Sequence, residues 1–302
     1  MIVRVLGSAA GGGVPQWNCA CTNCNAARAG AAPRRSQSSI AVSADGDRWY
    51  LVNASPDVAQ QIEAYEPLLP RTARGTPIAG AFFTDANVDH LGGLAVLRQQ
   101  GSHAFVLRSS AAVRALAAEQ VAFSAFARGP HRWESVPLDG GAVAPVDRDE
   151  PFGSTLEVRA LAVPGVLPGY AGRVAAPGAV VAYAFRDLRS NARALFAPVF
   201  AAIDDGLRAE LERADVVFLD GSFYRDDELE ALGLGDKRAT ALGHLPVGGE
   251  GGSLKAAAAL GGRRIFTHLN NSNPMLDPAS PEALAVAQAG GEVAYDGMEF
   301  HL

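Results

Sequence analysis

The sequence predicts a mixed α/β protein in which two β-sheets pack together between outer helices. The first observation is composition: 48% of the 302 residues are hydrophobic and 19% are charged, which is typical of a globular protein with a sizeable core. The second is that short apolar runs and helical stretches recur along the chain. The third is that no repeat, low-complexity tail or long linker interrupts them. We therefore expect a single domain over residues 1–302.

The predicted strands are short apolar runs bounded by turn residues. A hairpin is expected around Asp45-Gly46-Asp47, because apolar runs lie on both sides of this turn. Gly and Pro crowd into residues 164–178 and 243–252, where we expect loops. Strands are expected at residues 2–6, 39–42, 49–52, 78–83, 105–107, 156–163, 180–185, 216–219 and 265–267.

Helices are expected between these strands. Ser55 and Pro56 should begin one helix as its N-cap and first residue. Val58, Ile62 and Tyr65 supply the apolar face of that helix. Further helices are expected at residues 91–97, 111–126, 204–213 and 281–289.

Charge and cysteine usage exclude several classes of protein. The net charge of −6 argues against a nucleic-acid partner, because phosphate binding needs clustered Lys and Arg. No segment is apolar for long enough to span a bilayer, and the N-terminus lacks the features of a signal peptide. We therefore expect a cytoplasmic protein without a membrane partner. Three clustered cysteines also make a poor disulfide framework.

Polar side chains follow three of the predicted strands. Asp89 and His90 come shortly after the strand that ends at residue 83, whereas Asp220 and His268 directly follow two later strands. Rigid strand ends commonly present functional groups, so these side chains predict a mixed histidine and carboxylate metal site. Taken singly, Asp89 is also compatible with a helix N-cap, His90 with a surface residue and Asp220 with a turn residue.

The cysteines form a second candidate metal site. The pattern Cys19-x-Cys21-x-x-Cys24 places three thiolates on one side of a tight loop, as tetrahedral zinc requires. Free buried thiols or a redox pair are the alternatives. The chain has no fourth cysteine, so another residue must complete a zinc site.

Two other patterns have simpler interpretations. The glycines at residues 7–13 do not have G-x-G-x-x-G spacing and no helix is expected directly after them, so a tight turn is favoured over a dinucleotide site. His103, His131 and His301 are expected to be structural or loop residues. His244 lies in a glycine-rich loop, where an acid/base role and no role at all are both compatible with the sequence.

Residues 85–90 resemble the metal-binding motif HxHxDH of the metallo-β-lactamase superfamily. Asp85 and Asn87 stand in place of its first two histidines, whereas Asp89 and His90 retain the final pair. This resemblance implies a four-layer αββα sandwich. It also implies that Asp85 and Asn87 lie near the metal as oxygen donors, directly or through water.

The resemblance extends along nearly the whole chain. Asp220 is similar to the bridging aspartate of the superfamily and His268 to its last metal histidine, while residues 163–170 lack the expected third histidine element. This set of losses resembles the pyrroloquinoline quinone (PQQ) synthesis protein B family. So do the blocks Gly7-Ser-Ala-Ala-Gly-Gly-Gly13, Pro15-Gln-Trp-Asn-Cys19, Asn53-Ala-Ser-Pro-Asp57, Asp220-Gly-Ser-Phe223, Gly243-His244 and His268-Leu-Asn-Asn-Ser-Asn-Pro274.

The resemblance implies a cytoplasmic step in making PQQ from a cross-linked Glu–Tyr precursor. The activity proposed for the family is iron- and oxygen-dependent hydroxylation of the tyrosine ring, and an older proposal is transport of the cofactor. Losing three histidines should leave His90, His268 and a carboxylate from Asp89 or Asp220. That is the ligand set of mononuclear iron(II) oxygenases, although zinc, manganese, magnesium or copper can substitute in such a site. A non-catalytic carrier and a metal-dependent hydrolase remain alternatives.

Other expectations concern residues around the two sites. Related phosphodiesterases of the superfamily close the cysteine zinc site with a histidine, and that position is Asn271 here. The superfamily also places a proton-handling histidine at the position of His244, so we expect His244 near the metal but not bound to it. Arg34 and Arg35 could clamp a substrate carboxylate or be a solvated surface pair. A homodimer is compatible with the sequence.

Overall fold

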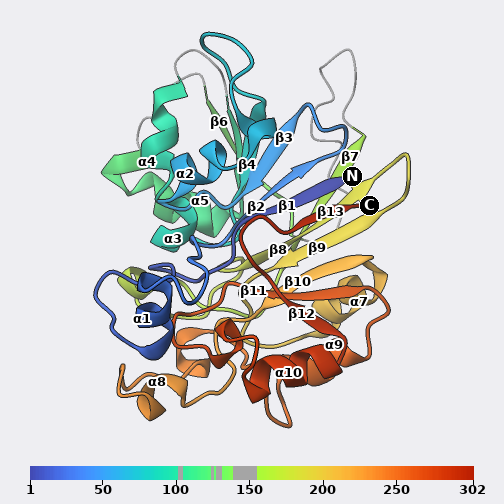
Figure 1. The fold of residues 1–302 in the computed structure, drawn as a ribbon. Helices are drawn as coiled ribbons and strands as arrows, with labels where there is room; N and C mark the ends of the chain where they lie inside the picture. Colours follow the sequence, from blue (N-terminus) through green and yellow to red (C-terminus); the bar gives the residue numbers. More distant parts are fainter. Residues whose placement is uncertain (101–104, 124–125, 127–130, 139–154) are drawn as a thin grey trace.

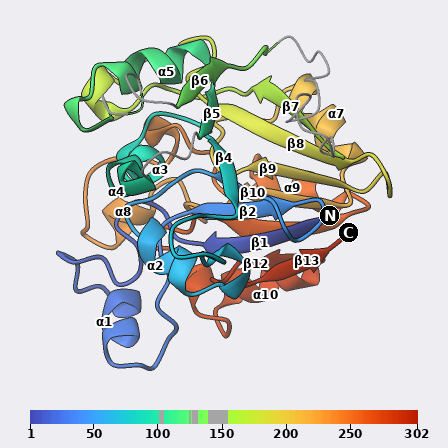
Figure 2. The same cartoon turned by 90° about the horizontal axis from the view of Figure 1, so that it is seen from above.

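The computed structural model describes residues 1–302 except 101–104, 124–125, 127–130 and 139–154. Its strands form two sheets that pack face to face, and helices cover the outer face of each sheet (Figure 1, Figure 2). The two ends of the chain lie side by side in both views, because the first strand pairs with the last. The layer order is therefore the αββα sandwich that the family resemblance implies.

The first sheet contains seven strands within the described residues, in the order β13-β1-β2-β3-β4-β5-β6. Pairing is antiparallel from β13 to β3 and parallel from β3 to β6. The strands are β1 (Ile2–Gly7), β2 (Ser39–Ser43), β3 (Trp49–Val52), β4 (Ile78–Phe82), β5 (Val106–Ser109), β6 (Arg132–Ser135) and β13 (Glu299–His301).

The second sheet contains six strands within the described residues, in the order β12-β11-β10-β9-β8-β7. The β7, β8 and β9 strands are antiparallel, whereas β9 to β12 run parallel. The strands are β7 (Leu156–Ala162), β8 (Val181–Asp187), β9 (Arg193–Ala197), β10 (Val216–Asp220), β11 (Arg263–Thr267) and β12 (Gly291–Val293).

Helices pack on both outer faces. Those between β3 and β6 cover the first sheet, and those after β9 cover the second. None of the helices in the described residues has the length and hydropathy of a membrane-spanning segment. The helices are α1 (Thr22–Arg28), α2 (Val58–Glu63), α3 (Val88–Leu91), α4 (Leu94–Leu97), α5 (Ala111–Ala118), α7 (Asp205–Arg213), α8 (Glu228–Ala231), α9 (Ser253–Ala258) and α10 (Pro281–Gln288).

Buried apolar side chains form one cluster between the two sheets and one beneath each helical layer. The central cluster is rich in aromatic rings. Phe82 of β4 lies 5.2 Å from Tyr183 and 5.9 Å from Phe185, both on β8 of the other sheet, measured between ring centroids. Burial of this aromatic surface drives the two sheets together.

Most predicted elements occur, but several boundaries were wrong. The α2 helix begins at Val58, not Pro56, because the Ser55 hydroxyl accepts the amide hydrogen of Asp57 in a local turn before the helix. The predicted helix over 91–97 is divided into α3 and α4 at two glycines. A side chain at Gly93 would lie 2.3 Å from the Ser55 carbonyl oxygen, so the chain approaches too closely there for any other residue.

Other differences concern short elements. The α5 helix ends at Ala118, and a 3-10 turn at Val121–Phe123 follows, so the continuous helix expected to residue 126 was wrong. The β6, β9, β12 and β13 strands and the α1 helix were not predicted. The tight turn after β1 does occur, because Gly12 and Gly13 have φ angles of 93° and 68°.

Replacement of Phe82 tests the contact between the sheets. We expect Phe82→Ala to lower the free energy of unfolding by about 3–5 kcal/mol, because it leaves a cavity among rings from both sheets. Leu284→Ala removes a 49% exposed side chain and should change the same quantity by less than about 0.5 kcal/mol. Urea unfolding followed by circular dichroism measures both. Equal stability of the two variants would contradict this account of the core.

Candidate metal centre

Three chain segments meet at one end of the sandwich. Asp220 ends β10 and His268 follows β11, and these strands are parallel neighbours whose carboxyl ends lie together. The loop after β4 reaches the same place from the other sheet, where the Thr84 carbonyl oxygen accepts a hydrogen bond from the amide of Val181. Both sheets therefore contribute side chains to one place in the fold.

Asp89, His90 and His268 converge on one point. Oδ2 of Asp89 lies 3.7 Å from Nε2 of His90 and 3.5 Å from Nε2 of His268. Both Nε2 atoms are buried and have no hydrogen-bond partner among the residues that the structure describes. Buried polar atoms normally have a partner, and these two imidazole nitrogens face a carboxylate. Such a group of nitrogen and oxygen donors is suited to binding a metal ion. A metal ion therefore fits the residues present.

The simpler interpretations of two residues are wrong. His90 is fully buried and is not a surface residue. Asn87, not Asp89, occupies the N-cap position of α3, and Asp89 lies in the first turn of that helix. His268 has a φ angle of 58°, which is rare for a residue with a side chain and often accompanies a functional constraint.

Asp85 orients His90. Oδ2 of Asp85 lies 2.6 Å from Nδ1 of His90 and 2.9 Å from the Thr84 hydroxyl. Oδ1 of Asp85 accepts hydrogen bonds from the backbone amide and the side-chain amide of Asn87. Both oxygens of this carboxylate are therefore occupied by protein groups. The hydrogen bond to Nδ1 fixes the imidazole ring so that Nε2 points to the metal position.

Burial and neighbouring charges shift the pKa values of Asp85 and His90 in opposite directions. Burial alone would raise the pKa of Asp85, but the adjacent His90 outweighs burial and lowers that pKa. Burial alone would lower the pKa of His90, but Asp85 and Asp89 raise it to about 9. The two carboxylates therefore favour the protonated imidazole, and a metal ion bound at Nε2 would compete with that proton.

Asp220 is the centre of a second hydrogen-bond network. Its Oδ2 lies 2.8 Å from Nδ1 of His244 and accepts the amide hydrogen of Phe200, while its Oδ1 accepts the amide and hydroxyl hydrogens of Ser222. The Ser222 hydroxyl also lies 2.7 Å from Nδ1 of His268. Burial alone would lower the pKa of His244, but Asp220 raises it. The structure thus brings His244 to the site through Asp220.

These groups line a cavity of about 360 Å³, which is large enough for a small organic ligand. Asp89, His244 and His268 lie on its wall together with apolar residues of the 166–168 segment. Arg34 and Arg35 instead line a separate cavity of about 490 Å³. Arg35 donates hydrogen bonds to the Ser8 hydroxyl and to the Ala294 carbonyl oxygen, so it is engaged in the fold.

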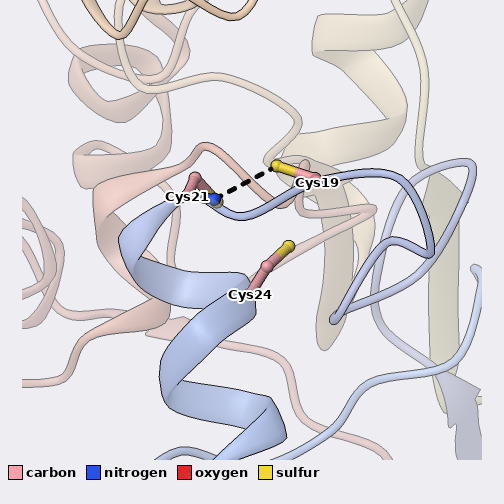
Figure 3. Close-up of side chains that lie close together, drawn as sticks. All are labelled: Cys19, Cys21 and Cys24. Carbon is pink, nitrogen blue, oxygen red and sulfur yellow. Dashed lines mark hydrogen bonds between the residues drawn. The ribbon is translucent and has the colours of Figure 1, made fainter.

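The cysteines form the second cluster (Figure 3). Cys19, Cys21 and Cys24 lie in the loop before α1 and in its first turn, and their sulfur atoms are all within 4.8 Å of one another. The side-chain amide of Asn271 lies 3.1 Å from Sγ of Cys19 and 3.5 Å from Sγ of Cys24. A half-turn of that amide exchanges its nitrogen for its oxygen, so Asn271 can present a ligand atom to the same point.

The electrostatics of the thiols favour a cation. Burial acts to raise the pKa of Cys21, but hydrogen bonds from Cys24 and Cys19 outweigh it and lower that pKa. Burial and the adjacent Cys21 raise the pKa of Cys24 to about 11. Ionisation of Cys24 at neutral pH therefore needs a positive charge nearby, and a zinc ion would supply that charge.

The remaining histidines lie elsewhere. His131 precedes β6, and its Nδ1 accepts a hydrogen bond from the amide of Phe105. His301 is exposed and pairs with Glu299. His103 lies outside the described residues. Sequence reasoning missed Arg173, which lines the metal cavity, because a lone arginine in a glycine-rich segment carries no motif.

Comparisons with known proteins agree with this geometry. Residues 48–269 match the family model of the β-lactamase superfamily domain. Coenzyme PQQ synthesis protein B from Cupriavidus taiwanensis is 41% identical over 99% of both chains, and that from Cupriavidus necator is 42% identical with the same coverage. The crystal structure of Zn²⁺-bound PqqB from Methylobacterium extorquens superposes with a TM-score of 0.92 at 36% identity, covering all of both chains.

A more distant likeness concerns the fold alone. The crystal structure of a diphosphatase from the PhnP family has a TM-score of 0.69 at 20% identity, covering all of this chain and 97% of that one. The full-length similarity to the PQQ synthesis proteins is much stronger. The chain therefore has a metallo-β-lactamase fold and belongs to the coenzyme PQQ synthesis protein B family.

Proposed function

We propose that this protein acts in PQQ biosynthesis as a hydroxylase that uses iron(II) and oxygen. Its substrate would be the tyrosine ring of a cross-linked Glu–Tyr precursor. The biosynthetic role is supported by the names of its full-length relatives. The observation that carries the reaction type is the pair of free Nε2 atoms, on His90 and His268, facing the Asp89 carboxylate.

Two histidines and one carboxylate are the protein ligands of mononuclear iron(II) oxygenases. Asp89 is the better carboxylate ligand, because both oxygens of Asp220 already accept hydrogen bonds from protein groups. Iron(II) held there would supply the oxygen activation that hydroxylation needs. Zinc, manganese, magnesium or copper would fit the same donors, so metal identity must be measured in the working protein.

The same geometry argues against a two-metal hydrolase. Such enzymes hold a second metal with additional histidines. Here Asp85 uses both oxygens to hold Thr84, Asn87 and His90 in place, and residues 163–170 contain no histidine. Asn87 lines the cavity, and its side-chain oxygen has no hydrogen-bond partner among the described residues, so it can accept from water or substrate.

We assign proton handling to His244. It lines the cavity, and Asp220 holds its Nδ1 at 2.8 Å, so the ring is fixed and its other nitrogen is available to exchange a proton. The Ser222 hydroxyl links this network to Nδ1 of His268 and so keeps the His268 Nε2 turned to the metal position.

We also propose that Cys19, Cys21, Cys24 and Asn271 bind a structural zinc ion. The side chain of Asn23 donates hydrogen bonds to the carbonyl oxygens of Asn271 and Asn273, so this site closes the start of the chain onto the loop that follows His268. Zinc there would stabilise the loop that carries a ligand of the other metal.

The ligand assignment is tested by removing each imidazole. His90→Ala and His268→Ala should each lower the affinity for iron(II) by at least about a hundredfold and abolish product, because a two-ligand site holds metal weakly. His244→Ala should keep the metal, since we do not assign it as a ligand. Iron content and mass spectrometry of the cross-linked Glu–Tyr product, with a reductant and with or without air, measure these effects.

Full activity of either ligand variant would refute the site. Metal loss by His244→Ala as complete as that by His268→Ala would show that His244 is a ligand. Product formation by the native protein without oxygen would favour the hydrolase, and tight quinone binding without turnover would favour the carrier.

The role of Asp85 is tested by a neutral replacement. Asp85→Asn should weaken iron(II) binding by about ten- to a hundredfold, because His90 loses the carboxylate that orients it. Asp47→Asn changes a 75% exposed carboxylate and serves as the control. Anaerobic competition with a chromophoric chelator measures both affinities. Unchanged affinity of Asp85→Asn would contradict the orienting role.

The zinc site is tested by elemental analysis. Purified native protein should retain zinc at the cysteines, and Cys21→Ala should lose nearly all of it, because two thiolates and an amide hold zinc far more weakly. His268→Ala should keep this zinc, which separates the two sites. Near-zero zinc in native protein and Cys21→Ala alike would contradict the assignment.

A further inference from the structure

Arg173 is placed differently from the other arginines. Among the described residues that line the metal cavity, it is the single Arg or Lys side chain. Asp89, His244 and His268 lie on the wall of the same cavity. A ligand in this cavity therefore meets the metal position and one guanidinium group.

The guanidinium of Arg173 has no hydrogen bond or ion pair with any residue that the structure describes. Other partly buried arginines are paired: Arg159 donates to Glu210 at 2.8 Å, and Arg108 lies 3.1 Å from Glu134. A half-buried cation beside apolar Val166 and Leu167 gains most from an anion that enters the cavity.

The backbone holds Arg173 in this place. Its φ angle is 51°, a conformation that residues with side chains rarely adopt, and its amide donates to the Pro168 carbonyl oxygen. A side chain at Gly169 would lie 2.8 Å from Nη2 of Arg173, so the glycine leaves the space that the guanidinium occupies. The Tyr170 hydroxyl donates to the Ala86 carbonyl oxygen, at 2.6 Å, and thereby fastens this turn to the loop of Asp85 and Asp89.

We propose that Arg173 binds a carboxylate of the substrate and so selects carboxylate-bearing, amino-acid-derived ligands for this cavity. The inference rests on the proposed function for the site. A bidentate ion pair at Arg173 fixes one end of the ligand, while the metal position and His244 face the rest of it. Specificity would then come from the carboxylate group and its distance from the reacting ring.

The probe is PQQ, a quinone with three carboxylates, and its trimethyl ester is the uncharged comparison. Both are titrated into zinc-loaded protein by calorimetry. Arg173→Ala and Arg173→Asn should weaken PQQ binding by about ten- to a hundredfold, because a charge-assisted hydrogen bond is lost. The Asn variant is included because Asn tolerates a positive φ angle, so the backbone is preserved. Arg173→Lys should recover part of the affinity.

Arg34→Ala is the matched control, because this exposed arginine lines the other cavity, and it should bind PQQ as the native protein does. The trimethyl ester should bind native protein and Arg173→Asn equally. The proposal is overturned if native protein does not bind PQQ or if Arg173→Asn binds PQQ as tightly as native protein does. It is also overturned if Arg173→Asn weakens binding of the ester as much as it weakens binding of PQQ.

A different result would refute the hydroxylase proposal. If native protein loaded with iron(II) forms no oxygen-dependent product, the reaction is refuted, but the result for PQQ binding at Arg173 still holds. In the converse case, hydroxylation with an unchanged KM in Arg173→Asn would uphold the reaction and refute the role of Arg173.

Discussion

The metal centre depends on buried carboxylates paired with imidazoles. Asp85 and Asp220 are fully buried, and each has an imidazole nitrogen within 2.8 Å. Removing a carboxylate from water costs several kcal/mol unless hydrogen bonds and opposite charge compensate it. His90 and His244 provide this compensation, so neither ring can rotate freely. Because Asp85 follows a strand of one sheet and Asp220 ends a strand of the other, the site also requires correct docking of the two sheets.

The same arrangement shows how this chain uses a position where the superfamily motif has a histidine. Asp85 stands where the superfamily motif has its first histidine, and its carboxylate is hydrogen-bonded to His90 and Asn87. The residue at the position of the first motif histidine thus orients His90. The free nitrogens of His90 and His268 remain directed at Asp89.

Much of the architecture could be predicted from local patterns. Short apolar runs located most strands, and polar residues at strand ends indicated the candidate site, because both signals lie within a few residues of sequence. The β9 strand was missed because Arg193–Ala197 is short and follows a polar turn. The roles of Asp85 and Asp220 depend on hydrogen bonds that only the folded chain reveals. Arg34 and Arg35 stood out as a pair, whereas the lone Arg173 carries no motif, and only the folded chain shows that it lines the metal cavity.

The contact between the start of the chain and the loop after β11 has a consequence for synthesis of the protein itself. Asn23 and the Asn271 carbonyl oxygen are joined by a hydrogen bond across 248 residues, and β1 pairs with the final strand β13. Contacts of such long sequence separation form late, after most of the chain is available. His268 is synthesised long after the three cysteines, because it follows them by more than 240 residues. A nascent chain therefore contains the cysteines early but cannot yet complete the pocket of histidines and carboxylates.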